Sequence, residues 1–338
     1  MLIGMNTPQN ILVRMPNWIG DLVMATPVLT DLRKGFPRAS ITAMCCSPVS
    51  DLLKTDESID ELFSFTKPSN EFGRRQERDI IAKIAAGKYD AGILLTNSFS
   101  SAWWFWQGRV ARRIGYTGHF RRWLLTDPLH LAPEKEHLVA TYKKLLQPLH
   151  ISPSQTAPRL YVADSEVEES KQLLYHQGYV RGKKLIGINP GSAYGPAKRW
   201  PPERFRQLAL RLLSETDAYV VFFGDDSVKE LGSGLPGKVI DLAGVTRLRE
   251  LACLIKDCDV LVTNDSGPMH IGAAFGVPLV ALFGSTDDQV TGPYNQSHHV
   301  INKRVKCSPC LKRVCPIDFP CMKQISVDEV IERVKRYV

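Results

Sequence analysis

The feature that most constrains the fold is an alternation of short apolar runs with helical patterns, which occurs in both halves of the chain. This alternation is typical of parallel strands joined by crossover helices. The sequence predicts strands at 11–14, 40–44, 91–95, 185–189, 219–223, 239–242, 260–263 and 279–283. It predicts helices over 20–36, 79–86, 137–149, 166–177 and 247–256. The expected fold class is therefore α/β, with doubly wound parallel sheets.

The length of 338 residues suits two domains, since one hydrophobic core seldom grows beyond roughly 250–300 residues. The stretch 150–158, which contains Pro153, Ser154 and Pro158, has the composition of a linker. We therefore expect an N-terminal domain over 1–155 and a C-terminal domain over 156–338, facing each other across a cleft. The last helix is a candidate to pack back on the N-terminal domain.

The composition is that of an ordinary globular protein, and its charge narrows the choice of partner. No run approaches the roughly 18 apolar residues of a membrane span, and the N-terminal MLIGMNTPQN lacks the pattern of a secretory signal. The sequence thus predicts a cytoplasmic protein. The formal net charge of +8 favours an anionic partner, which leaves open a nucleic acid, an acidic membrane surface or a phosphorylated substrate.

The stretch 262–278, VTNDSGPMHIGAAFGVP, predicts a strand, a tight turn and a helix. The first N–H groups of a helix have no partner within it and lie at the positive end of its dipole, so they suit phosphate oxygens. Gly267 allows close approach, Ser266 adds a hydroxyl, and His270 lies one turn later on the same face. Asp265 suits sugar hydroxyls, so a nucleotide-linked sugar would fit. The alternative is that Asp265 and Ser266 only cap the helix.

A second phosphate-directed element follows the predicted strand 185–189. The loop PGSAYGPAKRW contains glycines and ends near Lys198, whose ammonium group is a compact positive charge suited to a leaving pyrophosphate.

Asp21 lies at the start of the first predicted helix, just after the first strand. Ligands of open α/β sheets bind at the carboxyl ends of strands, so this carboxylate is either a helix cap or a general base that faces the site. The same turn has a single Gly20 and no GxGxxG, which argues against a dinucleotide-binding dehydrogenase.

The region 98–125 combines arginine and tryptophan and contains no acidic residue. One interpretation places the tryptophans in a helix core and the arginines on a solvated face. The other is a basic, aromatic-edged surface for an anionic amphiphile, with Arg121 and Arg122 as candidate acceptor contacts. Nucleic acid is a weaker interpretation, because no nucleic-acid-binding motif is present.

Four cysteines occur within the segment CSPCLKRVCPIDFPC. These are Cys307, Cys310, Cys315 and Cys321, and four thiolates can surround one tetrahedral ion. The spacing differs from a standard zinc ribbon. A structural zinc or iron site, free thiols and disulfides are the three interpretations, of which disulfides fit a cytoplasmic protein least.

Three stretches taken together resemble a known family. MPNWIGDLVMATPVL, NPGSAYGPAKRW and VTNDSGPMHIGAAFGVPLVALFGSTD are similar to the ADP-heptose–lipopolysaccharide heptosyltransferases of glycosyltransferase family 9, and GPAKRW is most like the heptosyltransferase II group. The resemblance extends over nearly the whole chain. It implies a GT-B fold, in which the N-terminal domain binds the acceptor and the C-terminal domain binds ADP-heptose.

The resemblance also implies roles for individual residues. Asp21 corresponds to the family's proposed general base, and Lys198 to its contact with the donor phosphates. The motif that binds pyrophosphate and heptose falls on Asp265, Ser266, Gly267 and His270. Ser192 matches a hydroxyl of the phosphate loop, and Val245 falls where the family lines the adenine pocket. The donor contacts also include Gly224, after which the family's acidic ribose contact remains unplaced.

The implied reaction is inverting and needs no metal or other cofactor. The expected function is transfer of L-glycero-D-manno-heptose from ADP-heptose to a heptose of the lipopolysaccharide inner core, on a lipid-A-linked acceptor. Partners would be the donor, the acceptor and an anionic membrane surface, with peripheral association at the cytoplasmic face of the inner membrane and no nucleic acid. The alternatives are another acceptor, either a different core position or a protein hydroxyl, and a non-catalytic nucleotide-sugar-binding protein.

Overall fold

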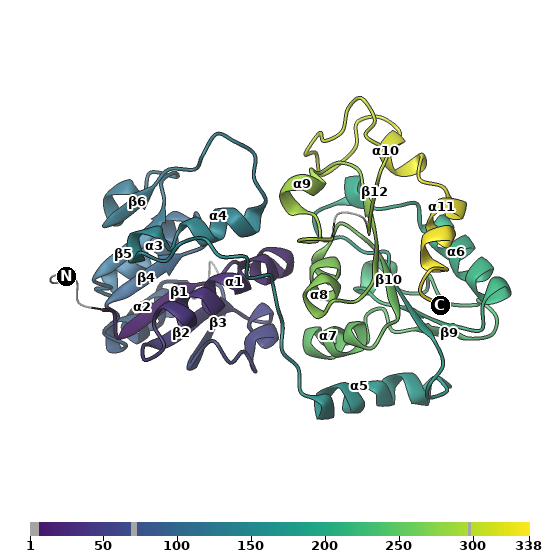
Figure 1. Cartoon of the computed structure of the whole chain (residues 1–338), viewed down its shortest axis with the longest axis horizontal. Coiled ribbons are helices and arrows are strands. Elements are labelled where there is room, and N and C mark those ends of the chain that lie inside the picture. Colours follow the sequence, from purple (N-terminus) through teal and green to yellow (C-terminus); the bar gives the residue numbers. More distant parts are fainter. Residues whose placement is uncertain (1–6, 69–72, 297–298) are drawn as a thin grey trace. The chain divides into compact units, whose positions relative to one another are not determined.

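The computed structural model describes residues 7–68, 73–296 and 299–338. The chain divides into two compact units, Met1–Tyr161 and Val162–Val338 (Figure 1). Each unit contains one six-stranded sheet in which every pairing is parallel, and helices cover the sheet faces. These are two doubly wound, Rossmann-like domains, as predicted.

The first unit has the strand order β3-β2-β1-β4-β5-β6. Its strands are β1 (Asn10–Arg14), β2 (Ser40–Cys46), β3 (Glu61–Phe65), β4 (Ala91–Leu94), β5 (Arg112–Tyr116) and β6 (Asp127–Leu129). Its α-helices are α1 (Ile19–Gly35), α2 (Gly73–Ala86), α3 (Phe99–Gln107) and α4 (Leu138–Lys144). The short strands β3, β5 and β6 were not predicted, because each mixes polar and apolar residues.

The second unit has the strand order β12-β11-β10-β7-β8-β9, which repeats that of the first unit when its strands are numbered from β7. The strands are β7 (Leu185–Asn189), β8 (Tyr219–Phe222), β9 (Val239–Asp241), β10 (Val260–Asn264), β11 (Leu279–Phe283) and β12 (Val300–Asn302). The helices are α5 (Asp164–His176), α6 (Pro202–Glu215), α7 (Leu248–Lys256), α8 (Gly267–Phe275), α9 (Asp288–Thr291), α10 (Pro320–Lys323) and α11 (Val327–Val334).

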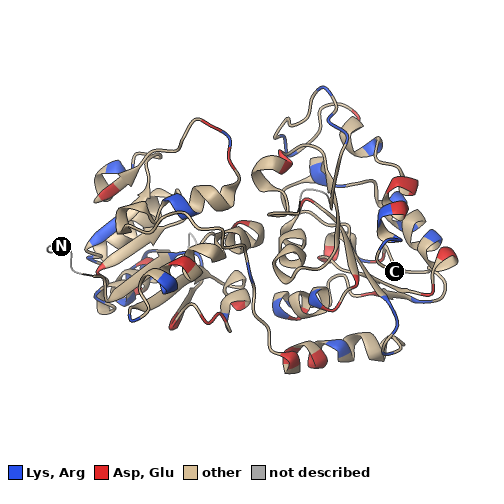
Figure 2. Ribbon diagram, in the orientation of Figure 1, with Lys and Arg blue, Asp and Glu red and all other residues tan. Residues whose placement is uncertain are grey.

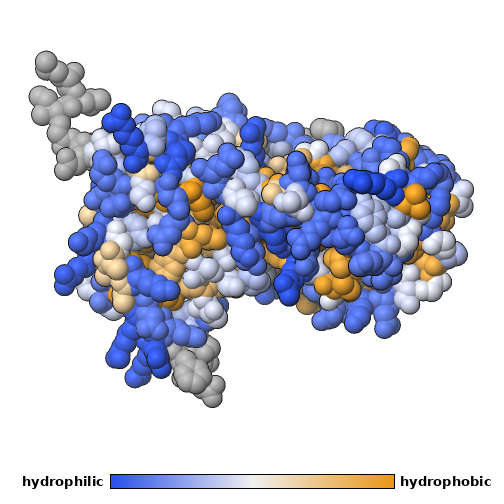
Figure 3. Space-filling view, turned by 90° about the horizontal axis from the view of Figure 1, so that it is seen from below, coloured by the Kyte–Doolittle hydropathy of each residue, from blue (hydrophilic) through white to orange (hydrophobic). Residues whose placement is uncertain are grey.

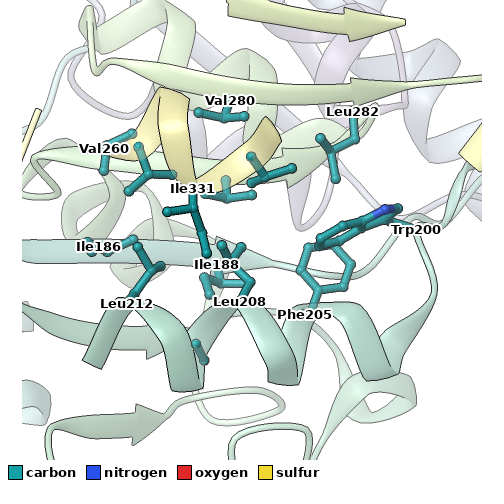
Figure 4. Close-up of a cluster of buried hydrophobic side chains, with 14 of the residues drawn as sticks. Ile186, Ile188, Trp200, Phe205, Leu208, Leu212, Val260, Val280, Leu282 and Ile331 are labelled. Carbon is teal, nitrogen blue, oxygen red and sulfur yellow. The ribbon is translucent and has the colours of Figure 1, made fainter. Parts of the chain in front are cut away.

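The core of the second unit forms where sheet residues meet α6 and α11 (Figure 4). Phe205 and Leu212 of α6 pack against strand residues such as Ile188, and Ile331 of α11 joins the same cluster. The last helix contributes to the core of its own unit, and its packing on the first domain stays a prediction. The face drawn in Figure 3 is mostly hydrophilic with scattered apolar patches, as expected when helices turn their apolar sides inward.

The unit boundary falls at Tyr161 rather than at residue 155 because the predicted linker is held by the first unit. The hydroxyls of Ser154 and Thr156 donate to the buried carboxylate of Asp31 in α1, and Lys143 Nζ donates to the Ser154 carbonyl at 2.9 Å. Within the described ranges, no helix is long and apolar enough to cross a membrane.

Candidate active site

The two predicted phosphate-directed elements meet at one edge of the second sheet. β7 and β10 are neighbours, and the chain leaves them toward opposite sides of the sheet, so their carboxyl ends form a topological switch point. The loop 190–201 follows β7, and the turn at Asp265 and Ser266 follows β10. Ligands of doubly wound sheets bind at this position.

Lys198 and Asp265 form an ion pair at this edge. Lys198 Nζ lies 2.5 Å from Asp265 Oδ2, and the two side chains are 12% and 4% exposed. The Thr286 hydroxyl, just beyond β11, donates to the same carboxylate oxygen, and the Lys198 ammonium also lies 4.5 Å from the centre of the Tyr194 ring. The arrangement holds one ammonium and one carboxylate side by side, where a phosphate and a sugar hydroxyl could each find a partner.

The start of α8 favours a ligand rather than a simple cap. Ser266 occupies the N-cap position, but its side chain makes no capping hydrogen bond. The Ser266 hydroxyl instead accepts from Asn189 Nδ2 at 3.1 Å and contacts the Thr263 hydroxyl at 3.1 Å. Because Asp265 turns to Lys198 and Thr286, neither residue acts as a side-chain cap, and the positive end of the helix dipole is directed at the same edge.

The loop after β7 is fixed by buried polar side chains. Ser192 is buried, and its hydroxyl donates to the Asp265 carbonyl at 3.2 Å. Asn264 connects to both ends of the loop, because its Nδ2 donates to the Pro190 carbonyl at 2.6 Å and its Oδ1 accepts from the Trp200 amide at 3.0 Å. No role was predicted from the sequence for Asn264, Asn189 or Thr286. The sequence pattern that could have identified them is a polar residue at or after the carboxyl end of an apolar strand.

The remaining donor candidates lie on or beside the same sheet edge. His270 is buried within α8, one turn after Ser266. Gly224 follows β8 with a φ of +146°, and its carbonyl accepts from the Gly244 amide at 2.9 Å, which brings the loop after β9 alongside. Val245, next in that loop, is 53% exposed. An exposed apolar side chain at the ligand edge of a sheet suits the flat face of a base.

In the first unit, Asp21 lies in the first turn of α1, directly after β1. The N-cap of α1 is Trp18, so Asp21 is not the cap residue, although its charge suits the positive end of the helix. Burial, with a smaller effect of the Asp21 charge, raises the pKa of Tyr142 well above its usual range. β1 and β4 are neighbours, so Asp21 stands at the switch point of the first sheet.

Arg121 and Arg122 have different surroundings. The Arg121 side chain is fully buried and donates to the carbonyls of Thr96 and Tyr116 and to Asn97 Oδ1. Burial lowers its pKa to about 10. Arg121 therefore braces the loop after β4, and of the two candidate acceptor contacts only Arg122 is exposed.

The tryptophans of region 98–125 divide between core and surface. Trp104 is buried and donates from Nε1 to Glu77 at 2.7 Å. Four other aromatic residues of the region form a surface cluster with ring centroids 5.0 to 6.5 Å apart; its members are Phe99, Trp103, Trp106 and Trp123. Trp123 is 60% exposed. The structure therefore places tryptophans of this region both in the core and at the surface, and binding of an anionic amphiphile at the exposed cluster stays a prediction.

The four-cysteine segment begins after β12 and ends at Cys321, which lies within α10. None of the four is in a disulfide, and Cys321 is buried whereas Cys307 is exposed. Among the described residues, no group of three or more His, Cys, Asp or Glu is placed to hold a metal ion. The structural zinc or iron site is therefore not confirmed and stays a prediction.

Solved structures share this architecture over nearly the whole chain. The structure described as E. coli ADP-heptose lps heptosyltransferase II has a TM-score of 0.81 and 28% identity, with 97% of this chain and 98% of that chain covered. A glycosyl transferase family 9 structure from Veillonella parvula has a TM-score of 0.85 and 27% identity, with 97% of each chain covered. The fold class is GT-B, and the protein is a glycosyltransferase.

Sequence comparisons define the family. The Glycosyltransferase family 9 (heptosyltransferase) description matches residues 78–319. Lipooligosaccharide heptosyltransferase 2 of Haemophilus influenzae is 31% identical over 308 residues, which are 86% of this chain and 88% of that protein. The chain belongs to glycosyltransferase family 9.

Proposed function

We propose that this enzyme transfers L-glycero-D-manno-heptose from ADP-heptose to a heptose of the lipopolysaccharide inner core, on a lipid-A-linked acceptor. The observation that carries the proposal is the Lys198–Asp265 ion pair beside the uncapped start of α8. The similarity to proteins described as ADP-heptose lps heptosyltransferase II and lipooligosaccharide heptosyltransferase 2 supports the choice of sugar and acceptor.

The donor would bind at the edge of the second sheet. The α8 N–H groups, the Ser266 hydroxyl and the Lys198 ammonium would bind the pyrophosphate, since charge-assisted donors to phosphate oxygens are strong. Asp265 would accept from heptose hydroxyls, and Val245 would pack on the adenine. Lys198 would then be shared between the phosphate and Asp265, so the carboxylate keeps a partner when the donor is bound.

The reaction would be one inverting displacement. The acceptor hydroxyl oxygen bonds to the anomeric carbon, the bond from that carbon to the phosphate oxygen breaks, and Asp21 takes the hydroxyl proton. The negative charge that develops on the departing ADP would meet Lys198 and the α8 N–H groups. Donors fixed where charge develops supply the stabilisation that a divalent ion supplies elsewhere, so we propose that transfer needs no metal.

The acceptor would bind to the first unit, near Asp21. The exposed Arg122 would contact acceptor phosphates, with Arg121 bracing the loop beside it. The surface aromatic cluster would meet the apolar part of a lipid-linked acceptor. We propose a cytoplasmic enzyme that associates peripherally with the inner membrane.

The test measures ADP release from ADP-L-glycero-D-manno-heptose with and without a heptose-terminated lipid A acceptor. We expect acceptor-dependent release that falls at least about a hundredfold in Asp21→Asn, because general base catalysis contributes typically 10²–10⁴-fold. Glu57→Gln is the matched control, since it removes an exposed carboxylate of the same unit and should leave the rate unchanged.

The outcomes separate the parts of the proposal. Release that does not depend on this acceptor would remove the inner-core assignment and direct the search to other core positions or protein hydroxyls. Donor binding without turnover on any acceptor would point to a nucleotide-sugar-binding protein. Full activity in Asp21→Asn would keep the enzyme and refute Asp21 as the base.

A further inference from the structure

The segment 303–317, between β12 and α10, combines positive charge with exposed apolar side chains, and we call it the basic loop. It contains no Asp or Glu. Its basic residues are Lys303, Arg304, Lys306, Lys312 and Arg313. In Figures 1 and 2 the chain between β12 and α10 extends past the rest of the second unit, with blue basic positions along it.

Part of this charge has no counterion among the residues that the structure describes. Lys303 pairs with Glu329 and Arg304 pairs with Asp288, so two of the five cations are neutralised. Lys306 and Lys312 are exposed, and neither has an ion pair within the described part of the chain. The outer part of the loop therefore presents uncompensated positive charge.

The apolar side chains next to these cations face outward. Leu311 is 63% exposed, Val314 is 65% exposed and Ile317 is 58% exposed. Single exposed apolar residues are common on protein surfaces, but three within seven residues, beside Lys312 and Arg313, form a combined patch.

The backbone of the loop is anchored next to the exposed apolar side chains. Leu311 donates its amide to the Ser285 carbonyl at 2.7 Å and accepts from the Tyr194 hydroxyl at 2.7 Å. The Arg313 carbonyl accepts from the Ala197 amide at 3.1 Å, so the basic loop packs against the loop 190–201, which carries Lys198. The exposed apolar residues therefore stand on a fixed support.

We propose that the basic loop is a docking surface for the headgroups of an anionic lipid bilayer. Near such a surface Lys and Arg gain attraction to the negative potential, and apolar side chains beside them enter the boundary between headgroups and acyl chains. The inference deepens the proposed function, on which it rests for the presence of a membrane-bound acceptor. It adds a membrane contact in the second unit, next to the loop 190–201.

The chemistry of the loop favours lipid over other occupants. A second copy of this chain would place like charges together at the patch, which is unfavourable. A nucleic acid would use the cations but would leave Leu311, Val314 and Ile317 without an apolar partner. A bilayer interface uses both kinds of side chain.

The experiment measures sedimentation of the full chain with vesicles, in the absence of donor and acceptor. The vesicles are phosphatidylcholine alone or phosphatidylcholine mixed with phosphatidylglycerol. We expect binding to the mixed vesicles only. Lys306→Gln combined with Lys312→Gln should weaken it about 25-fold, since each cation near the surface is worth about fivefold. Val314→Ser combined with Ile317→Ser should weaken it at least about tenfold.

The matched control is Arg181→Gln combined with Arg336→Gln, which removes the same charge from exposed positions of the second unit outside the loop. It should bind like the parent. An equal loss in the control, unchanged binding in the loop variants, or no binding by the parent would each overturn the proposal. Tighter binding to duplex DNA than to the mixed vesicles would also overturn it. Because no sugar substrate is present, a negative result in the vesicle experiment leaves the transferase proposal intact. A negative result in the transfer assay likewise does not change the vesicle-binding result.

Discussion

The ion pair between Lys198 and Asp265 makes a prediction about stability that does not depend on any ligand. Lys198→Met would leave the Asp265 carboxylate, which is 4% exposed, with the Thr286 hydroxyl as a neutral partner. Removing one member of a buried pair typically costs about 3–5 kcal/mol, because the remaining charge is buried without compensation. Since Thr286 still donates, we place the expected loss near the lower end, at about 3 kcal/mol.

Hydrogen exchange of the β7 and β10 amides is the assay, because these neighbouring strands end at the pair. A loss of about 3 kcal/mol corresponds to exchange that is roughly two orders of magnitude faster. Adding Asp265→Asn should restore most of the protection, since an amide carries no charge and still accepts from Thr286. The Lys183–Asp217 pair of the same unit is the control, because both side chains are exposed and Lys183→Met should change little.

Two results would refute this reasoning. Unchanged protection in Lys198→Met would mean that the carboxylate has other compensation. If the losses of protection in Lys198→Met and Asp265→Asn simply add in the double variant, Lys198 and Asp265 are not coupled.

Two further predictions follow from the described burial. Arg121→Met should lower the stability of the first unit by about 2–4 kcal/mol, because it leaves several buried carbonyls without donors. Arg122→Met should keep the stability and raise the KM for the acceptor. Urea unfolding measures the stability and acceptor titration the KM, and equal stability losses in the two variants would contradict the assignment. Burial raises the pKa of Cys45 to about 12, so its thiol should react with iodoacetamide only on unfolding at pH 9, while the exposed Cys307 reacts in the folded chain. Because the unfolded Cys45 loses its proton near pH 9 and the folded one near pH 12, the unfolding free energy should fall as the pH rises through this window. Labelling of Cys45 as fast as that of Cys307 in the folded protein would contradict the burial of Cys45.

Much of the fold could be predicted because strongly apolar strands are recognisable in the sequence. β7, β10 and β11 are buried along their whole length, and their continuous apolar runs are typical of parallel central strands. The edge strands β3 and β6 were missed because they are only partly buried and their sequences alternate irregularly. β5 was hidden in the arginine-rich stretch, where Arg112 pairs with Asp127 of β6 rather than facing a ligand.

By itself, the sequence determined the alternation of elements and the residue types at the strand ends, and hence the family and the polar residues of the candidate donor site. Only the tertiary structure decided which of these residues meet. Lys198, Asp265 and Thr286 follow three different strands, and the parallel register brings their ends to one edge. The tertiary structure also separated Arg121 from Arg122, because a buried brace and an exposed cation are the same residue type in a sequence, and only packing distinguishes them.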